Sequence, residues 1–143
     1  MVFFTALEIA EANLALQVGI FFAIAVGYGL KRKRKYFLHG MLMLAAVVLN
    51  AFSFFLVMGP SLFNMGEFIF DNFSSRLALV AVFHGVFGAL AEILGILLLA
   101  VWGFRASTQN CARKKKLMWP TLILWIVALV LGIVFYAINY LGY

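Results

Sequence analysis

Apolar residues fill four long stretches of the chain, and most of the charged residues lie between them. A helix needs about 20 apolar residues to cross the hydrocarbon core of a bilayer, and each stretch reaches that length. The second stretch is predicted to stop at Gly59-Pro60, a residue pair that is typical of turns. The four predicted membrane spans cover residues 11–30, 36–58, 77–104 and 117–141.

The connections between these stretches predict how the helices pack. Residues 31–35 form a short link that favours antiparallel neighbours, so the simplest fold is an all-α, antiparallel four-transmembrane-helix bundle in one domain over 1–143. The apolar runs are too long for the strands of a membrane barrel. Residues 59–76 are predicted to form an outer loop on the membrane surface, because this segment contains four phenylalanines. They are Phe63, Phe68, Phe70 and Phe73.

Basic residues predict the orientation of the bundle. Ten of the eleven lysines and arginines lie in residues 31–35 and 105–116, whereas Arg76 lies on the opposite side. By the positive-inside rule, the two basic loops are cytoplasmic and both termini lie outside, as in a multi-pass protein of the cell membrane. The residues expected at lipid head groups are Lys31, Arg32, Lys33, Arg34, Lys35, Arg113, Lys114, Lys115 and Lys116.

Composition supports a membrane protein and argues against other classes. Hydrophobic residues make up 66% of the chain and charged residues 11%, whereas soluble domains carry about a quarter charged residues. The net charge of +6 comes from clusters beside the spans, so we interpret it as lipid contact rather than nucleic-acid binding. The sequence has no phosphate-binding glycine loop, HExxH motif or serine–histidine–acid set, which predicts a non-enzymatic protein. Cys111 is the only cysteine, so no internal disulfide forms.

Several polar residues fall inside the predicted spans, and the helical rise of about 1.5 Å per residue assigns each a depth. Glu92 lies near the midplane and is best interpreted as a neutral acid that is hydrogen-bonded to Asn50 or to a backbone carbonyl. A role in proton or quinone handling is the functional alternative, because ionisable residues inside a span are costly. The outer half of the bundle is expected to gather Asn13, Gln17, Asn50, Ser53, His84, Tyr136 and Asn139.

The third span carries a face of small residues that includes a histidine. Within about 40° of one another on this helix lie His84, Gly88, Ala91, Gly95 and Trp102. Small residues on one face of a membrane helix indicate close packing against another helix. His84 is therefore expected to point into the bundle, where it is the main candidate for contact with a cofactor or a metal.

Haem b and copper are the candidate cofactors. The chain has two histidines, His39 and His84, and they differ in depth by about 20 Å or more, so one haem cannot bridge them within a chain. A haem that is bound by His84 would therefore take its second ligand from Met58 or from His84 of another protomer. Copper is the weaker candidate, because the histidine and the nearby methionines form no tight motif. The candidate cofactor contacts are His84, His39, Met58 and Tyr136, and His84 is also the candidate metal ligand.

His39 has two interpretations. It follows the basic run at the cytoplasmic interface, where a histidine is commonly one more polar group among snorkelling lysines and arginines. Contact with an acidic cofactor group or a lipid phosphate is the alternative.

The placement of the histidines and the loop lengths follow a known arrangement. One segment, YFLHGMLMLAAVVLNAFSFFL, contains His39, and a later one, FHGVFGALAEILGILLLAVWGFR, begins beside His84. A third segment, KLMWP, leads into the fourth span. Together they resemble the DUF420 family of small four-helix membrane proteins over nearly the whole chain from the first span onward. The family commonly has a further histidine where this chain reads CARKKKL, so an inner-face site that needs that histidine together with His39 would be incomplete here.

The resemblance implies a respiratory context, because some members of that family act in the maturation of haem–copper cytochrome oxidases. It implies a small accessory or assembly subunit, with His39 and His84 as the histidines that match the family pattern. A small b-type cytochrome subunit in membrane electron transport and a purely structural subunit are the alternatives. The expected partners are the lipid bilayer and either other membrane subunits or a second copy of the chain.

Overall fold

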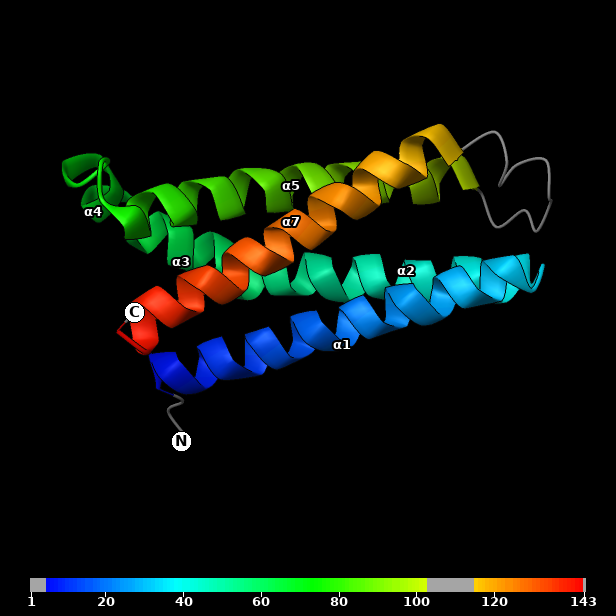
Figure 1. Ribbon diagram of the computed structural model, residues 1–143, viewed down its shortest axis with the longest axis horizontal. Helices are drawn as coiled ribbons and strands as arrows, with labels where there is room; N and C mark the ends of the chain where they lie inside the picture. Colours follow the sequence, from blue (N-terminus) through cyan, green and yellow to red (C-terminus); the bar gives the residue numbers. More distant parts are fainter. Residues whose placement is uncertain (1–4, 103–114, 143) are drawn as a thin grey trace.

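The computed structural model describes residues 5–102 and 115–142, and nearly all of these residues are helical. The described chain contains four helices that are long and apolar enough to cross a membrane, which confirms the predicted all-α membrane fold. Figure 1 shows them lying along the long axis of the molecule. They are α1 (Ala6–Arg32), α2 (Tyr36–Ser53) with its continuation, α5 (Arg76–Trp102) and α7 (Lys115–Tyr140).

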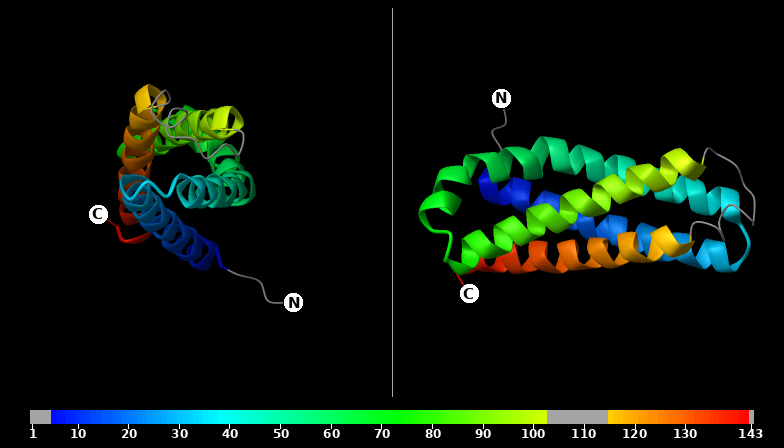
Figure 2. Two further views of the ribbon diagram at one scale, coloured as in Figure 1. Left: turned by 90° about the vertical axis from the view of Figure 1, so that its right-hand side faces the viewer. Right: turned by 90° about the horizontal axis from the view of Figure 1, so that it is seen from above.

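The long helices form two antiparallel pairs, α1 with α2 and α5 with α7. The contact between α5 and α7 is the most extensive, and the contact between α1 and α2 is the next. The end-on view in Figure 2 shows the four helices arranged around a common centre. The turn between α1 and α2 is tight because Arg34 adopts a left-handed backbone conformation, with φ at 59°. The predicted antiparallel four-helix bundle is thus confirmed.

The first helix begins with a capping box. The Glu8 N–H donates to the Thr5 hydroxyl over 3.2 Å, and the Thr5 N–H donates to a Glu8 carboxylate oxygen over 2.7 Å. These bonds satisfy backbone donors that have no partner inside the helix. At the other end, Lys31 and Arg32 occupy the last turn, where cations are favourable near the helix carbonyls.

The prediction that the second span stops at Gly59-Pro60 is wrong. After Ser53 the helix passes into a π-helical turn, η1 (Phe54–Met58), and then into α3 (Gly59–Asn64). The Gly59 N–H bonds to the Phe54 carbonyl, five residues back, so the helix is wider at this point. Pro60 then falls in the first turn of α3, where a residue without an N–H is tolerated.

The predicted loop over residues 59–76 is also largely helical. A second short helix, α4 (Gly66–Asp71), follows α3 and leads through a turn into α5. The four phenylalanines of this segment are exposed, and Phe63 and Phe70 are the most exposed at 86% and 85%. Aromatic side chains are enriched at membrane–water interfaces, which favours a position of this segment on the membrane surface. That position stays a prediction.

Small and branched side chains fill the centre of the bundle, whereas large apolar side chains cover its outside. Phe22, Leu56 and Val101 are 62%, 70% and 60% exposed. A soluble protein rarely exposes apolar surface on this scale, but lipid chains cover it at no cost. The main buried cluster consists of Ile20, Ile24, Ala46, Val47, Ala91 and Trp125.

The small-residue face of α5 lies inside the bundle, as predicted. Ala91 and Gly95 are buried, and a Cβ atom at Gly95 would lie 3.1 Å from a Val47 methyl group on α2. A Cβ atom at Gly88 would be in ordinary contact with Ala128 on α7. The glycines therefore allow α5 to approach both neighbouring helices closely.

Candidate functional site

His84 projects from α5 toward α7, and its orientation is fixed by a hydrogen bond to the backbone. Its Nδ1 atom lies 2.8 Å from the carbonyl oxygen of Ala128. A carbonyl can only accept, so Nδ1 carries the proton, and in the neutral ring Nε2 is left as an acceptor. Gly132 makes room for the ring, since a Cβ atom there would lie 2.9 Å from Cε1 of His84.

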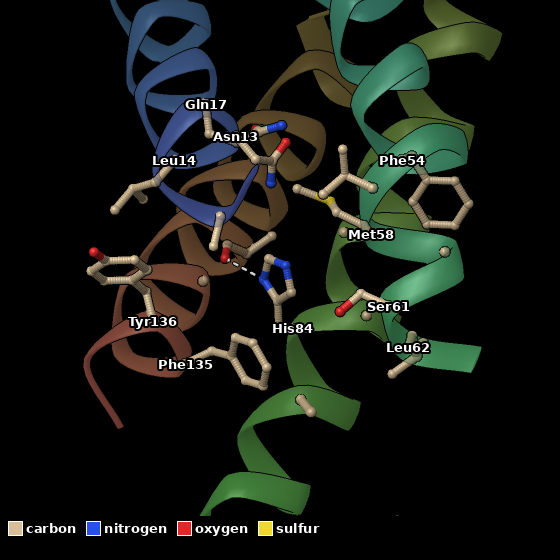
Figure 3. Close-up of a pocket in the computed structure, with 18 of the residues that line it drawn as sticks. Asn13, Leu14, Gln17, Phe54, Met58, Ser61, Leu62, His84, Phe135 and Tyr136 are labelled. Carbon is tan, nitrogen blue, oxygen red and sulfur yellow. Dashed lines mark hydrogen bonds between the residues drawn. The ribbon is translucent and has the colours of Figure 1, made fainter. Parts of the chain in front are cut away.

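His84 lines a cavity of about 390 Å³ between the helices, which we call the His84 cavity. A volume of this size falls in the range of small-molecule sites, about 300–1,000 Å³. Figure 3 shows the imidazole at the centre of this space, with Asn13 of α1 on one side and Met58 of η1 reaching in from the other. Polar residues that line the cavity are Asn13, Gln17, Asn50, Ser61, Asn64, His84, Tyr136 and Tyr140.

A chain of hydrogen bonds joins α1 to α2 beside this cavity. Gln17 donates to the Ser53 hydroxyl over 3.0 Å, and that hydroxyl donates to the side-chain oxygen of Asn13. Gln17 and Ser53 are both buried. The expected gathering of polar residues at one end of the bundle is therefore found for this group.

Two other residues of the expected polar group lie toward the surface. Asn139 is exposed and does not line the His84 cavity, so its expected place in the group was wrong. Tyr136 and Tyr140, which flank it on the same helix, line the cavity instead, so Asn139 lies on a different side of α7. Tyr136 does line the cavity, and its hydroxyl donates to Glu11 over 3.3 Å at the exposed rim.

Glu92 and Asn50 form a buried pair between α5 and α2. Asn50 donates from Nδ2 to one Glu92 oxygen over 2.7 Å, which confirms the predicted contact. Glu92 is only 5% exposed, and its other oxygen has no hydrogen-bond partner among the described residues. Asn50 lines the His84 cavity whereas Glu92 does not, so the carboxyl group lies behind the amide.

His39 repeats the arrangement of His84 at the opposite end of the bundle. Its Nδ1 lies 2.8 Å from the carbonyl oxygen of Gly27 on α1, so Nδ1 again donates and Nε2 is the acceptor. It lines a second cavity of about 160 Å³, which we call the His39 cavity. The two histidines thus belong to separate cavities, as their difference in depth predicts.

The predicted head-group residues do not all behave alike. Lys31 is half-buried, lines the His39 cavity and places its ammonium 3.7 Å from the Met118 sulfur. The side chains of residues 32–35 and of Lys116 are exposed, as head-group contact requires. Arg113 and Lys114 lie outside the described residues, as do Arg105, Cys111 and the side chain of Lys115. Contact of the exposed basic side chains with lipid stays a prediction.

The residues around His84 fit some cofactors better than others. No cluster of three or more histidine, cysteine, aspartate or glutamate residues that could hold a metal ion occurs among the described residues. A haem iron asks for only two axial ligands, and an organic ligand for one or two polar contacts. His84 and Met58 line the same cavity and supply such a pair.

Sequence reasoning missed the residues that orient the histidines. Ala128 contributes only its backbone carbonyl, and Gly27 contributes a carbonyl together with its missing side chain. The one available signal was the occurrence of glycines in the interiors of the first and fourth spans, where glycine lowers helix stability and therefore has a packing role.

Comparison of the chain with protein-family models, with curated proteins and with solved structures finds no match. The fold and the geometry define its class. It is a four-helix membrane protein in which His39 and His84 each line a cavity between helices, with Nδ1 bonded to the backbone of a neighbouring helix.

Proposed function

We propose that the protein is a small, non-enzymatic accessory or assembly protein of a membrane respiratory complex of the haem–copper oxidase type. One observation carries this proposal: His84 is held by Ala128 with its Nε2 available to the His84 cavity. Histidines that ligate a cofactor commonly donate the other ring N–H to a carbonyl, because this fixes the tautomer and the ring orientation. The resemblance of the histidine-bearing segments to the DUF420 pattern supports the respiratory context.

A small b-type cytochrome subunit is the second candidate, and Met58 favours it. Met58 extends from η1 into the same cavity as His84 (Figure 3), so the two side chains supply a histidine and a thioether from facing helices. Such a pair holds haem iron in some electron carriers. The haem would supply one-electron transfer, and the chain would supply its axial ligands and the apolar surroundings.

We also propose that the chain lies in the cell membrane with its basic loops in the cytoplasm and both termini outside. The support is the concentration of ten of the eleven basic residues in residues 31–35 and 105–116. Under this orientation the His84 cavity opens in the outer half of the membrane. The outward-facing apolar side chains of the helices contact lipid and other membrane subunits, or a second copy of the chain.

Replacement of His84 by alanine tests the accessory function. In a strain that lacks the chromosomal gene, the His84→Ala protein should fail to restore assembly of the oxidase, measured as haem absorbance of the membranes and as oxygen consumption. Asn139→Ala is the control, because it removes an exposed polar side chain near the end of α7 that does not line the His84 cavity. Immunoblotting of the membranes checks that both variants accumulate to the wild-type level. Normal oxidase levels in the His84→Ala strain would contradict the proposal.

An absorption spectrum of the purified, reduced protein separates the two candidates. A b-type cytochrome shows Soret and alpha bands, and these bands should weaken or shift in Met58→Leu, which keeps the volume of the side chain but removes the sulfur. A spectrum without these bands, from protein purified after haem supplementation of the culture, would remove the cytochrome candidate and leave the accessory function.

A further inference from the structure

We propose that the His39 cavity binds the hydroxyl-bearing ring of a membrane quinol. His39 Nε2 accepts a hydrogen bond from one ring hydroxyl, and the Lys31 ammonium donates to a ring oxygen. The site is separate from the His84 cavity, so this proposal does not depend on the function proposed above.

The first support is the acceptor that the structure presents. His39 is buried, its Nδ1–H is taken by the Gly27 carbonyl, and Nε2 has no hydrogen-bond partner among the described residues. A Cβ atom at Gly27 would displace the Met43 methyl group, so glycine at this position lets Met43 and His39 of α2 pack directly against α1. Because His39 lines the cavity and Nδ1 is already bonded, Nε2 is the ring atom that can accept from a ligand hydroxyl there.

The second support is the size of the cavity. Its volume is about 160 Å³, and an apolar protein cavity of about 150 Å³ is known to bind benzene. One six-membered ring therefore fits, whereas a haem macrocycle does not. The cavity lies between helices that are apolar enough to span a membrane, which suits a ring that carries an apolar tail.

The third support is the wall of the cavity. Methionines and leucines line it, together with all three tryptophans of the chain, which are Trp102, Trp119 and Trp125. Trp102 packs so closely on Gly40 that a Cβ atom there would overlap the indole ring. Indole rings offer flat apolar faces on which an aromatic ring stacks favourably.

Besides His39, the polar side chains that line the cavity are Tyr28, Lys31, Tyr36 and Thr121, and a tyrosine hydroxyl can both donate and accept. Thr121 lines the cavity but already donates its hydroxyl hydrogen to the Leu117 carbonyl over 2.7 Å. Among the described residues, the hydrogen bond of the Lys31 ammonium goes to the Met118 sulfur, a weak acceptor, so the ammonium keeps its capacity to donate. His39 thus offers one acceptor and Lys31 offers donors, which is the pattern that a quinol hydroxyl matches.

An anionic lipid head group fits this pattern less well. A phosphate oxygen is an acceptor, and the neutral His39 ring presents an acceptor toward it, so the two would repel. Several exposed basic residues in the turn after α1 offer a lipid phosphate better contacts outside the cavity.

Tryptophan fluorescence provides the test. The full-length protein, in nanodiscs of zwitterionic lipid, is titrated with a short-tailed benzoquinol kept under reducing conditions. Because every tryptophan lines the His39 cavity, binding there should quench the emission in a saturable way. His39→Leu should raise the apparent dissociation constant by about tenfold or more, as expected for one lost hydrogen bond to a buried group.

A second pair of variants tests the proposal independently, in case His39→Leu does not fold. Lys31→Met should weaken quinol binding by a few fold or more, whereas the neighbouring Arg32→Met should bind as the wild type does, because Arg32 is exposed and does not line the cavity. Lys31→Met keeps most of the side-chain length, and Lys31 lies in the last turn of α1, so the bundle should tolerate this change.

Three results would overturn the proposal. One is quenching that rises linearly with quinol and is equal in the wild type, His39→Leu and Lys31→Met, since this indicates partition into the bilayer. Another is saturable quenching that His84→Leu abolishes and His39→Leu leaves intact, since Trp125 lines both cavities and would then report the His84 cavity. The third is displacement of the quinol when the nanodiscs contain phosphatidylglycerol, which would assign the cavity to an anionic lipid.

Discussion

His84 and Ala128 join α5 to α7 through a hydrogen bond of 2.8 Å between the imidazole Nδ1 and a backbone carbonyl. The same bond recurs between His39 and Gly27 in the other helix pair. A helical carbonyl already accepts one bond within its helix, but its second lone pair is free to accept another. Each histidine is therefore satisfied on one side, while Nε2 is left for a ligand.

Gly132 should be intolerant of even one added methyl group. A Cβ atom there would lie 2.9 Å from the His84 ring, so Gly132→Ala must displace the imidazole and distort its bond to Ala128. We expect a loss of about 1–3 kcal/mol in the free energy of unfolding, as in other overpacked interiors. Thermal unfolding in detergent, followed by circular dichroism, measures the change.

Gly19 supplies the matched control for this substitution. A Cβ atom at Gly19, on α1, would have no heavy atom within 4 Å, so Gly19→Ala should be neutral or stabilise the helix by up to about 1 kcal/mol. If both alanine variants unfolded at the same temperature, the close approach of Gly132 to His84 would not be part of the folded protein.

The pair of Asn50 and Glu92 should show a measurable coupling energy. Asn50→Leu leaves the buried Glu92 carboxyl group without its hydrogen bond, so we expect a loss of about 1–3 kcal/mol in unfolding free energy. In the double variant with Glu92→Leu, part of this loss should return, because no unpaired polar group remains. A double-mutant cycle should give a coupling of about 0.6–2 kcal/mol, and strictly additive effects would contradict a direct bond in the membrane.

The sequence predicted these polar contacts better than it predicted the course of the backbone. Counting the helical rise brought Asn50 and Glu92 to one depth, and the small residues of the third span showed which way His84 points. The backbone carbonyl of Ala128 could not be foreseen, because any residue supplies a carbonyl and only the crossing of α5 and α7 selects that one. Gly59-Pro60 misled for a similar reason, since the π-helical turn before it has no clear sequence signature.

Glu92 should be present as a neutral carboxylic acid in the native protein. One of its oxygens accepts from Asn50, but the other is buried without a hydrogen-bond partner among the described residues, and burying a charge in this way costs far more than burying the acid. Infrared spectroscopy should therefore show a protonated carbonyl band at neutral pH that disappears in Glu92→Gln. A carboxylate band that is lost in the same variant would contradict the expectation.

The proposed orientation predicts which cysteines a membrane-impermeant maleimide reaches in intact cells. Cys111 lies outside the described residues, in the second basic segment, and the positive-inside rule places that segment in the cytoplasm. It should react only after the membrane has been permeabilised. Ser74 is exposed in the turn between α4 and α5, at the end of the bundle away from residues 31–35, so Ser74→Cys combined with Cys111→Ser should react in intact cells. Labelling of Cys111 in intact cells, with protection of Ser74→Cys, would indicate the opposite orientation. The His84 cavity would then lie in the cytoplasmic half of the membrane.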